Sequence, residues 1–250
     1  MKLQELTDYL SNLFLDYVCE DYSNNGLQVE ASSEVRKVAF AVDACKHCID
    51  AAADAGAQLL VVHHGISWGP GFRRIVGTDA ARFSAMFSRG VSLFAMHLPL
   101  DAHRALGNNA VIADRLGLVD RQPFCEVRGL KIGVSGSPSE KMSLTEFDAL
   151  VKAKISSSTL VLDNTGGRCS RVAVVSGQCS DFFGICAENG IDCLLTGEVL
   201  HQHYHSAREY GVSVIAAGHY ETETWGVRSL QAEISRLGLE TIFIDAPTGL

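Results

Sequence analysis

Residues 59–65 read LLVVHHG, an apolar run that leads directly into two histidines and a glycine. A second apolar run, KVAFAV, stands at residues 37–42, and the segment 44–55 carries a helical pattern that ends before Gly56. Short apolar runs that alternate with helical segments are typical of parallel strands buried on both faces of a sheet. The stretch from residue 37 to residue 65 therefore predicts a strand–helix–strand unit.

The same alternation continues on both sides of this unit. Helices are predicted at residues 3–15, 78–89 and 143–154, and strands at 91–96, 130–134 and 159–162. This order predicts an α/β protein with largely parallel or mixed sheets.

The second half of the chain repeats the pattern of the first. At a shift of 134 residues the strand–helix–strand unit aligns without a gap, and it matches Val38 with Val172, Ala39 with Ala173, Cys45 with Cys179, Gly56 with Gly190 and Leu60 with Leu194. The identities are few, so an accidental match is the alternative. We favour an internal duplication that yields two similar three-layer α/β domains, residues 1–125 and 126–250. The sequence leaves this boundary open, and the halves can interleave.

Composition excludes several classes of protein. Lys and Arg number 21 against 29 Asp and Glu, a formal net charge of −8, and 47% of the residues are hydrophobic. Global disorder is excluded, and the negative charge argues against a general binder of nucleic acids or membrane surfaces. No apolar run approaches the ~18 residues of a membrane helix. The opening MKLQEL lacks the apolar region of a signal peptide, so we expect a cytoplasmic protein with reduced cysteines.

Residues 45–48 form a Cys-x-x-Cys motif inside the helix predicted at 44–55. No second pair stands at zinc spacing. We therefore favour burial of the two thiols in the core over a redox or zinc-binding role.

Histidines and carboxylates follow the predicted strands of both halves; they are His63, His64, His97, Asp101, Glu198, His219 and Glu223. In open α/β sheets ligands bind outside the carboxyl ends of the strands, and two related halves would point such ends into one cleft. Imidazole nitrogen and carboxylate oxygen together suit Zn, Mn, Fe, Co or Ni. One tetrahedral ion needs fewer ligands, whereas two ions ~3.5–4 Å apart, bridged by a carboxylate, would use the whole set.

Each of these residues also has a simpler interpretation. Residues 63–64 could cap a strand, and both can bind one site only if the chain turns, which Gly65 permits. His97 is the weakest ligand candidate and could instead orient Asp101. Glu223 lies near the start of a predicted helix, where the helix dipole favours a carboxylate without a metal. These interpretations do not explain why all the residues fall at strand ends.

A histidine-rich segment, residues 201–205, lies on a predicted helix. Positions 201 and 205 share a face of such a helix. We expect His205 at the edge of the cleft, where Glu198 or His205 could carry a proton during catalysis.

Four separated motifs resemble those of the Nif-three-like family, whose members are often labelled type 2 GTP cyclohydrolase I homologues. The motifs are HHG at residues 63–65, HLPLDAH at 97–103 with GNN at 107–109, TGE at 196–198 and GHYETE at 218–223. The segment NNGLQV at residues 24–29 also fits. The resemblance covers essentially the whole chain and matches the short bacterial form of the family.

The resemblance implies a pair of similar α/β domains around a dinuclear metal site. By motif, the ligands would be His63, His64, Asp101, His219 and Glu223, with Asp101 or Glu223 bridging and His97 close by. It further implies ring-shaped homohexamers whose sites face an internal cavity. It offers GTP cyclohydrolase as a candidate activity.

These observations favour a hydrolase that uses two divalent ions per chain on a nucleotide-like or other anionic small molecule. A divalent ion lowers the pKa of bound water from ~15.7 to about 7, and the hydroxide attacks carbon or phosphorus. Ring opening of GTP and phosphoester hydrolysis would use the same ions, and no Walker-type loop identifies a triphosphate. The alternative is a non-catalytic metal-binding scaffold or regulatory protein.

Overall fold

The computed structural model describes residues 1–178 and 181–250, so Cys179, which the alignment matches with Cys45, lies outside the described residues. The chain divides into two compact units. The first contains Met1–Leu100 and Val227–Ala246, and the second contains Asp101–Gly226 and Pro247–Leu250. Residues 101–125, predicted to belong to the first half, are part of the second unit, and the halves interleave near the C-terminus.

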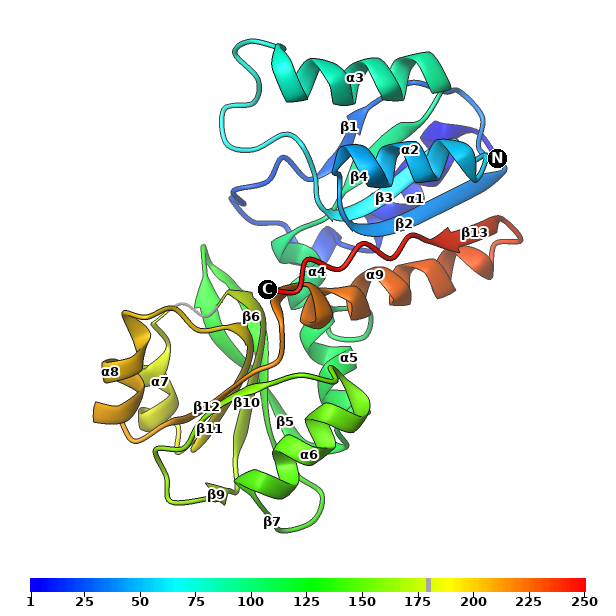
Figure 1. The fold of residues 1–250 in the computed structure, drawn as a ribbon. Coiled ribbons are helices and arrows are strands. Elements are labelled where there is room, and N and C mark those ends of the chain that lie inside the picture. The colour runs from blue at the N-terminus through cyan, green and yellow to red at the C-terminus, as the bar shows by residue number, and fades with distance from the viewer. Residues whose placement is uncertain (179–180) are drawn as a thin grey trace. The chain divides into compact units, whose positions relative to one another are not determined.

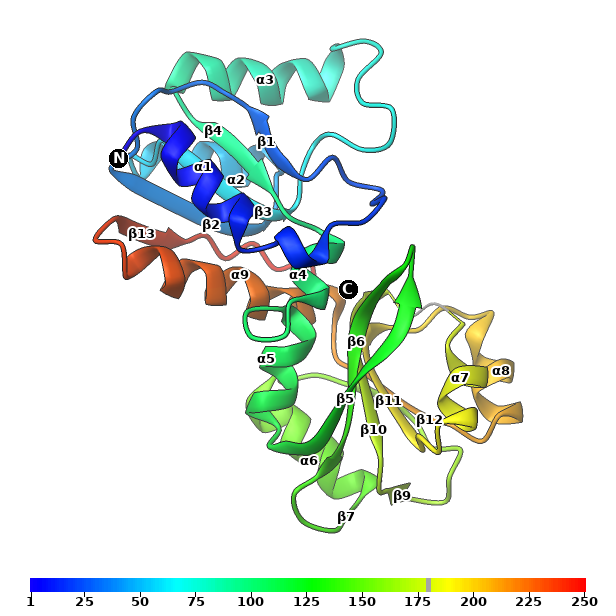
Figure 2. The same ribbon diagram turned by 180° about the vertical axis from the view of Figure 1, so that it is seen from behind.

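The first unit is built on a sheet with the strand order β1-β4-β3-β2-β13. These strands are β1 (Gly26–Val29), β2 (Lys37–Asp43), β3 (Leu59–His64), β4 (Ser92–Ala95) and β13 (Glu240–Phe243). All neighbours are parallel except β1, which pairs antiparallel with β4. The helices of this unit include α1 (Leu3–Asn12), η1 (Leu15–Tyr17), α2 (Lys46–Asp54) and α3 (Gly77–Arg89). Figure 1 shows α2 in front of the sheet, and α1 lies in front in the reverse view of Figure 2.

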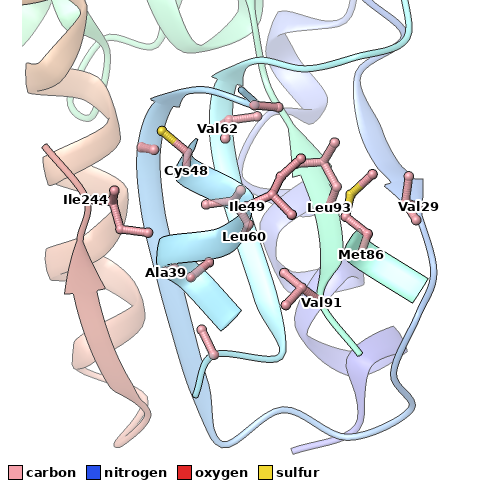
Figure 3. Packing of buried hydrophobic residues seen from close by; sticks show 14 of the residues in the cluster. Val29, Ala39, Cys48, Ile49, Leu60, Val62, Met86, Val91, Leu93 and Ile244 are labelled. Carbon is pink, nitrogen blue, oxygen red and sulfur yellow. The ribbon is translucent and has the colours of Figure 1, made fainter. Parts of the chain in front are cut away.

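The sequence pattern of the central strands explains this layered arrangement. Residues 38–42 and 59–63 are buried, so neither face of β2 and β3 is exposed to solvent along these residues. Helices must therefore cover both faces of the sheet. On one face, side chains of α2 and α3, such as Ile49 and Met86, pack against Leu60 and Val62 of β3 (Figure 3).

The second unit has a sheet with the order β5-β6-β10-β11-β12-β8. These strands are β5 (Leu118–Val127), β6 (Leu130–Pro138), β8 (Leu160–Leu162), β10 (Val172–Gln178), β11 (Cys193–Glu198) and β12 (Ser213–Ala216). Strands β10, β11 and β12 are parallel, and the others join antiparallel. Helices α5 (Asn108–Arg115) and α6 (Leu144–Lys154) flank one face, and α7 (Phe183–Glu188) and α8 (His203–Glu209) flank the other (Figures 1 and 2). The short strands β7 (Met142–Ser143) and β9 (Arg168–Cys169) pair with each other.

Two helices cross the division between the units, namely α4 (Leu98–Ala102) and α9 (His219–Ser235). The predicted α/β class with mixed sheets is confirmed. The sequence patterns did not predict β1, β5 or β13. Strand β5 lies at a sheet edge, carries Pro123 and is largely exposed, so it lacks the apolar run that identifies a central strand. Within the described residues, no helix has both the length and the apolar character that crossing a bilayer requires.

The two sheets share a pairing pattern. In the first unit Val38 pairs with Leu59, and in the second Val172 pairs with Cys193, so both partners are displaced by the offset that aligns the sequences. An antiparallel edge strand also flanks the third parallel strand in each unit, β1 beside β4 and β8 beside β12. This correspondence is what a duplicated unit would leave, and the duplication itself stays a hypothesis.

Candidate metal-binding site

In the first unit, three histidines gather at the carboxyl ends of two neighbouring strands. His63 and His64 are the last residues of β3, and His97 follows β4. Each residue offers one ligand atom, and these atoms all lie within 4.8 Å of one another. The ring centroids of His63 and His64 are 4.6 Å apart, and that of His97 lies 5.1 Å from His63. The structure therefore brings together these three predicted candidates, including His97.

Strand β3 includes both His63 and His64, so the two rings lie close together without the chain turn that was expected at Gly65. Gly65 instead permits close packing, because a Cβ atom there would lie 2.3 Å from Oε1 of Gln28. The same Oε1 accepts hydrogen bonds from the backbone N–H groups of Ile66 and Ser67, at 2.8 and 3.1 Å. Gly65 thus lets Gln28 fasten the loop that follows the two histidines.

Each of the three imidazoles has its Nδ1 atom next to an oxygen that can act only as an acceptor. The contacts are His63 Nδ1 with the Met96 carbonyl at 3.0 Å, His64 Nδ1 with Asp43 Oδ1 at 2.9 Å, and His97 Nδ1 with Asp21 Oδ1 at 2.8 Å. In a neutral imidazole that donates from Nδ1, the lone pair is on Nε2. Hydrogen bonding of the second ring nitrogen to a carbonyl or carboxylate is typical of histidines that bind metals.

Asp21 is much more enclosed than Asp43, because its side chain is only 1% exposed against 34% for Asp43. Besides His97, its carboxylate accepts from the backbone N–H of Leu98 at 2.9 Å and from Asn25 Nδ2 at 2.8 Å. Burial opposes ionisation, but the hydrogen bonds from His97 and Asn25 outweigh it and lower the pKa of Asp21 to about 2. The charged carboxylate therefore holds both the ring and the backbone of residues 97–98.

The indole of Trp68 lies beside the imidazoles. Its ring meets that of His97 edge-on at a centroid distance of 5.1 Å, and its Nε1 donates to the Gly65 carbonyl at 2.9 Å. The residue is 37% exposed. It offers a flat aromatic surface next to the histidine cluster.

In the second unit, Asp101 is buried and held by two neutral donors. Its Oδ1 accepts from Asn108 Nδ2 and from Ser176 Oγ, both at 2.9 Å. Asn108 is itself fully buried, and its Oδ1 accepts from the backbone N–H of Gly226 at 2.6 Å. These two donors fix the orientation of the Asp101 carboxylate.

His219, the first residue of α9, stands between two carboxylates. Its Nδ1 lies 3.2 Å from Glu198 Oε1, and its Nε2 lies 3.2 Å from Glu223 Oε1. The hydrogen bond to Glu223 raises the pKa of His219 to about 9, against the effect of burial, and Glu198 adds to it. Two carboxylates around one imidazole form an anionic group of nitrogen and oxygen donors, which suits a divalent cation.

Glycines keep space for these side chains. At Gly177 in β10 a Cβ atom would lie 2.3 Å from Glu223 Oε1 and 3.4 Å from His219 Nε2, and at Gly197 in β11 it would lie 2.8 Å from the Cα of His219. The absence of side chains at these two glycines thus leaves room for the first turn of α9 beside the ends of β10 and β11.

His205 is exposed on α8, and its ring packs edge-on against Tyr204 at 5.3 Å. His201 is also exposed, but α8 begins at His203, so positions 201 and 205 do not share a helix face as predicted. The histidine of this segment that turns inward is His203, which is buried. The sequence missed Asp21 and Asp43 as partners of the histidines. Asp43 ends β2, the neighbour of β3, so the strand-end rule could have found it; Asp21 lies in a turn with no such signal.

The family model for DUF34/NIF3 (NGG1p interacting factor 3) matches residues 1–249. Curated relatives that carry the name GTP cyclohydrolase 1 type 2 homolog include one from Archaeoglobus fulgidus, 41% identical over all of both chains. Another, from Halobacterium salinarum, is 44% identical over 92% of each chain.

Solved structures show the same fold. The protein ybgI, described as of unknown function, has a TM-score of 0.93 at 33% identity, and TTHA1606 from Thermus thermophilus has 0.87 at 39% identity; each match covers both chains fully. Together with the matched residues of the family model, these likenesses establish that the chain belongs to the DUF34/NIF3 family.

Proposed function

We propose that this chain is a divalent-metal-dependent hydrolase with two ions per chain, bound by His63, His64, Asp101, His219 and Glu223, and with His97 as a further ligand or orienting group. The observation that carries the proposal is the shared pattern of the three imidazoles, each with Nδ1 directed at an oxygen acceptor. A histidine in a protein core can form such a hydrogen bond without binding a metal. Three neighbouring rings that all direct Nδ1 at an oxygen acceptor are, by contrast, typical of a metal-binding group.

The donor chemistry fits the expected ions. The first unit offers imidazole nitrogens, and the second offers His219 with the carboxylates of Asp101, Glu198 and Glu223. No thiolate stands among these side chains, so Zn, Mn, Fe, Co or Ni is expected in a catalytic role rather than a structural zinc knot. Asp101 or Glu223 would act as the bridging ligand.

The bound ions would supply an activated water and polarise the substrate. Glu198 is the residue that we assign to proton transfer, because it is one-third exposed and already hydrogen-bonded to His219. His205, exposed on the neighbouring helix α8, is the second candidate for this role. A general base needs hydrogen-bond reach to its proton, which a carboxylate beside His219 is better placed to provide.

The substrate class that we propose is a nucleotide-like or other anionic small molecule. The exposed indole of Trp68 beside His97 provides a surface on which a planar heterocycle could stack. Ring opening of GTP is the candidate reaction, since the curated relatives carry the name GTP cyclohydrolase 1 type 2 homolog. A phosphoesterase would use the same residues, and a non-catalytic metal-binding scaffold is the rival from another class.

Metal analysis and a substrate screen test this proposal together. Purified protein should contain two divalent ions per chain and should deplete a member of a broad panel of nucleotides and phosphoesters. The variants Asp101→Ala and Glu223→Ala should abolish turnover, while Glu126→Gln, which alters an exposed carboxylate on β5, should leave it unchanged. Turnover that survives both substitutions would refute the hydrolase. Bound metal without turnover of any panel member would favour the scaffold.

We also propose that the chain forms a homohexamer, as the family resemblance implies. Analytical ultracentrifugation of the purified protein measures the mass of the assembly directly. A monomeric or dimeric species at micromolar concentration would contradict the proposal.

A further inference from the structure

The Cys-x-x-Cys motif of residues 45–48 lies at the start of α2. The sequence predicts a position inside the helix, with both thiols buried in the core. Cys45 is the N-cap residue of α2, and its sulfur accepts a hydrogen bond from the backbone N–H of Cys48 at 3.4 Å. The two sulfur atoms lie 3.4 Å apart, within hydrogen-bonding distance for thiols. The motif therefore holds two free thiols in direct contact.

The two cysteines differ in their exposure to solvent. Cys45 is partly exposed, whereas Cys48 is completely buried. Figure 3 shows Cys48 among the core side chains between α2 and the sheet, close to Val62 of β3. An accessible sulfur thus stands directly in front of a protected one.

The surroundings of Cys45 stabilise its thiolate. The side-chain hydrogen bond with Cys48 lowers the pKa of Cys45 to about 5 in spite of partial burial, and hydrogen bonds from the backbone N–H groups of Cys48 and His47 act in the same direction. The hydrogen bond to Cys45 and burial raise the pKa of Cys48. A thiolate at a helix N-terminus is also favoured by the helix dipole, and such cysteines are typical of reactive thiols.

We propose that Cys45 and Cys48 form a redox-active dithiol that exchanges with disulfides, with Cys45 as the attacking sulfur and Cys48 as the resolving sulfur. The partner is a disulfide of a small thiol, such as oxidised glutathione. This activity goes beyond the metal-dependent hydrolysis proposed above and depends on none of its ligands.

The exchange balances as two displacements. The Cys45 thiolate attacks one sulfur of the partner disulfide, which forms a mixed disulfide and releases one thiolate. Cys48 then loses its proton to solvent and attacks the Cys45 sulfur, which forms the internal disulfide and releases the second thiolate. The protein is oxidised by two electrons, and the two released thiolates take up from solvent the two protons that Cys45 and Cys48 gave up, so the partner ends as two thiols. The sulfur atoms need to close from 3.4 Å to a bond of ~2.05 Å, a small movement for side chains one helical turn apart.

Among the cysteines that the structure describes, no other pair shows this arrangement of one accessible and one buried sulfur. Cys169 and Cys193 are both buried in the core of the second unit, and the hydrogen bond with Cys169, together with burial, raises the pKa of Cys193. Cys19 is partly exposed, like Cys45, and serves as an internal reference for reactivity.

Mass spectrometry of the protein as purified tests the proposal. With limiting iodoacetamide at neutral pH, Cys45 should be alkylated at least ~10-fold faster than Cys19, since the thiolate is the nucleophile. Incubation with oxidised glutathione should produce a peptide in which Cys45 and Cys48 are linked, lighter by two hydrogens. Dithiothreitol should reverse the link. Equal alkylation of Cys45 and Cys19, or no linked peptide, would overturn the proposal.

Variants separate the two roles. Cys48→Ala should trap glutathione on Cys45, whereas Cys45→Ala should leave Cys48 unmodified. Cys19→Ser, the matched control, should form the internal disulfide as the unaltered chain does. Circular dichroism checks that each variant folds, and the alkylation measurement on the unaltered chain needs no variant. Glutathione found on Cys48 in Cys45→Ala at the rate of Cys45 would contradict the assigned order of attack.

Discussion

The Nδ1 atom of His97 lies 2.8 Å from Oδ1 of Asp21, although the two residues are separated by 76 positions in the chain. This contact ties a histidine that follows β4 to a carboxylate in the turn before β1. The carboxylate fixes the ring so that Nε2 presents its lone pair. Asp21 is therefore a positioning residue for the histidine cluster.

Replacement of Asp21 by Asn should weaken metal binding. An amide can turn its NH₂ group toward Nδ1, and this would reverse the tautomer that places the lone pair on Nε2. We expect a loss of about 10- to 100-fold in affinity for the chosen divalent ion, measured by competition with a chelator. Asp16→Asn changes an exposed carboxylate of the same segment and should leave affinity unchanged. If Asp21→Asn and Asp16→Asn bound the divalent ion with equal affinity, Asp21 would not be a positioning residue of the metal site.

Replacement of Gly177 by Ala should disturb Glu223 and His219 directly. A Cβ atom would lie 2.3 Å from Glu223 Oε1, and the residue has a φ of +66°. Gly190 has the same φ, but nothing lies within 4 Å of a Cβ built there. Gly190→Ala should thus cost only the backbone strain of about 1 kcal/mol, whereas Gly177→Ala should also lose bound metal. Urea unfolding and elemental analysis of both variants separate strain from displacement of the carboxylate; equal metal content would contradict this interpretation.

The sequence predicts what depends on local pattern and misses what depends on distant pairing. The apolar run before His63 and His64 identifies both the strand and the position of the imidazoles at its carboxyl end. Strand β13 has only four residues, and its place in the first unit depends on pairing with β2, about 200 residues earlier. Residues 227–246 return to the first unit, and no local sequence pattern shows this return. From the sequence, a single boundary near residue 125 was therefore predicted.

Asn108 should contribute strongly to stability because it is buried and joins three segments. It donates to Asp101 at 2.9 Å and accepts from the Gly226 N–H at 2.6 Å. Asn108→Ala would remove one donor to the buried Asp101 carboxylate and the side-chain acceptor of the Gly226 N–H, so we expect a loss of about 1–3 kcal/mol in the free energy of unfolding, measured in urea. Asn189→Ala removes an exposed asparagine at the C-terminal cap of α7, whose side chain donates to the Ile185 carbonyl, and should cost less than about 0.5 kcal/mol. A cost at Asn108 no larger than at Asn189 would contradict its joining role.

The stability of the loop that follows β8 should depend on pH through the ionisation of Asp163. The Gly167 N–H donates to Asp163 Oδ1 at 3.0 Å and the Thr165 N–H at 3.1 Å, and the bond from Gly167 is the main reason why the pKa of Asp163 is lowered from 3.8. A carboxylate with a lowered pKa in the folded state stabilises the fold above its unfolded pKa and loses this effect as the pH falls through the folded value.

Asp163→Asn should therefore be less stable than the unaltered chain near neutral pH, and the difference should shrink as the pH is lowered below 3.8. Urea midpoints measured from pH 7 downward follow this difference, and Glu20→Gln, at an exposed carboxylate, provides the reference for a general change of charge. Because Asp163 is nearly solvent-exposed, water screens the effect and the shift in midpoint should be small. A difference that grows toward acid would mean that the charged form of Asp163 destabilises the loop.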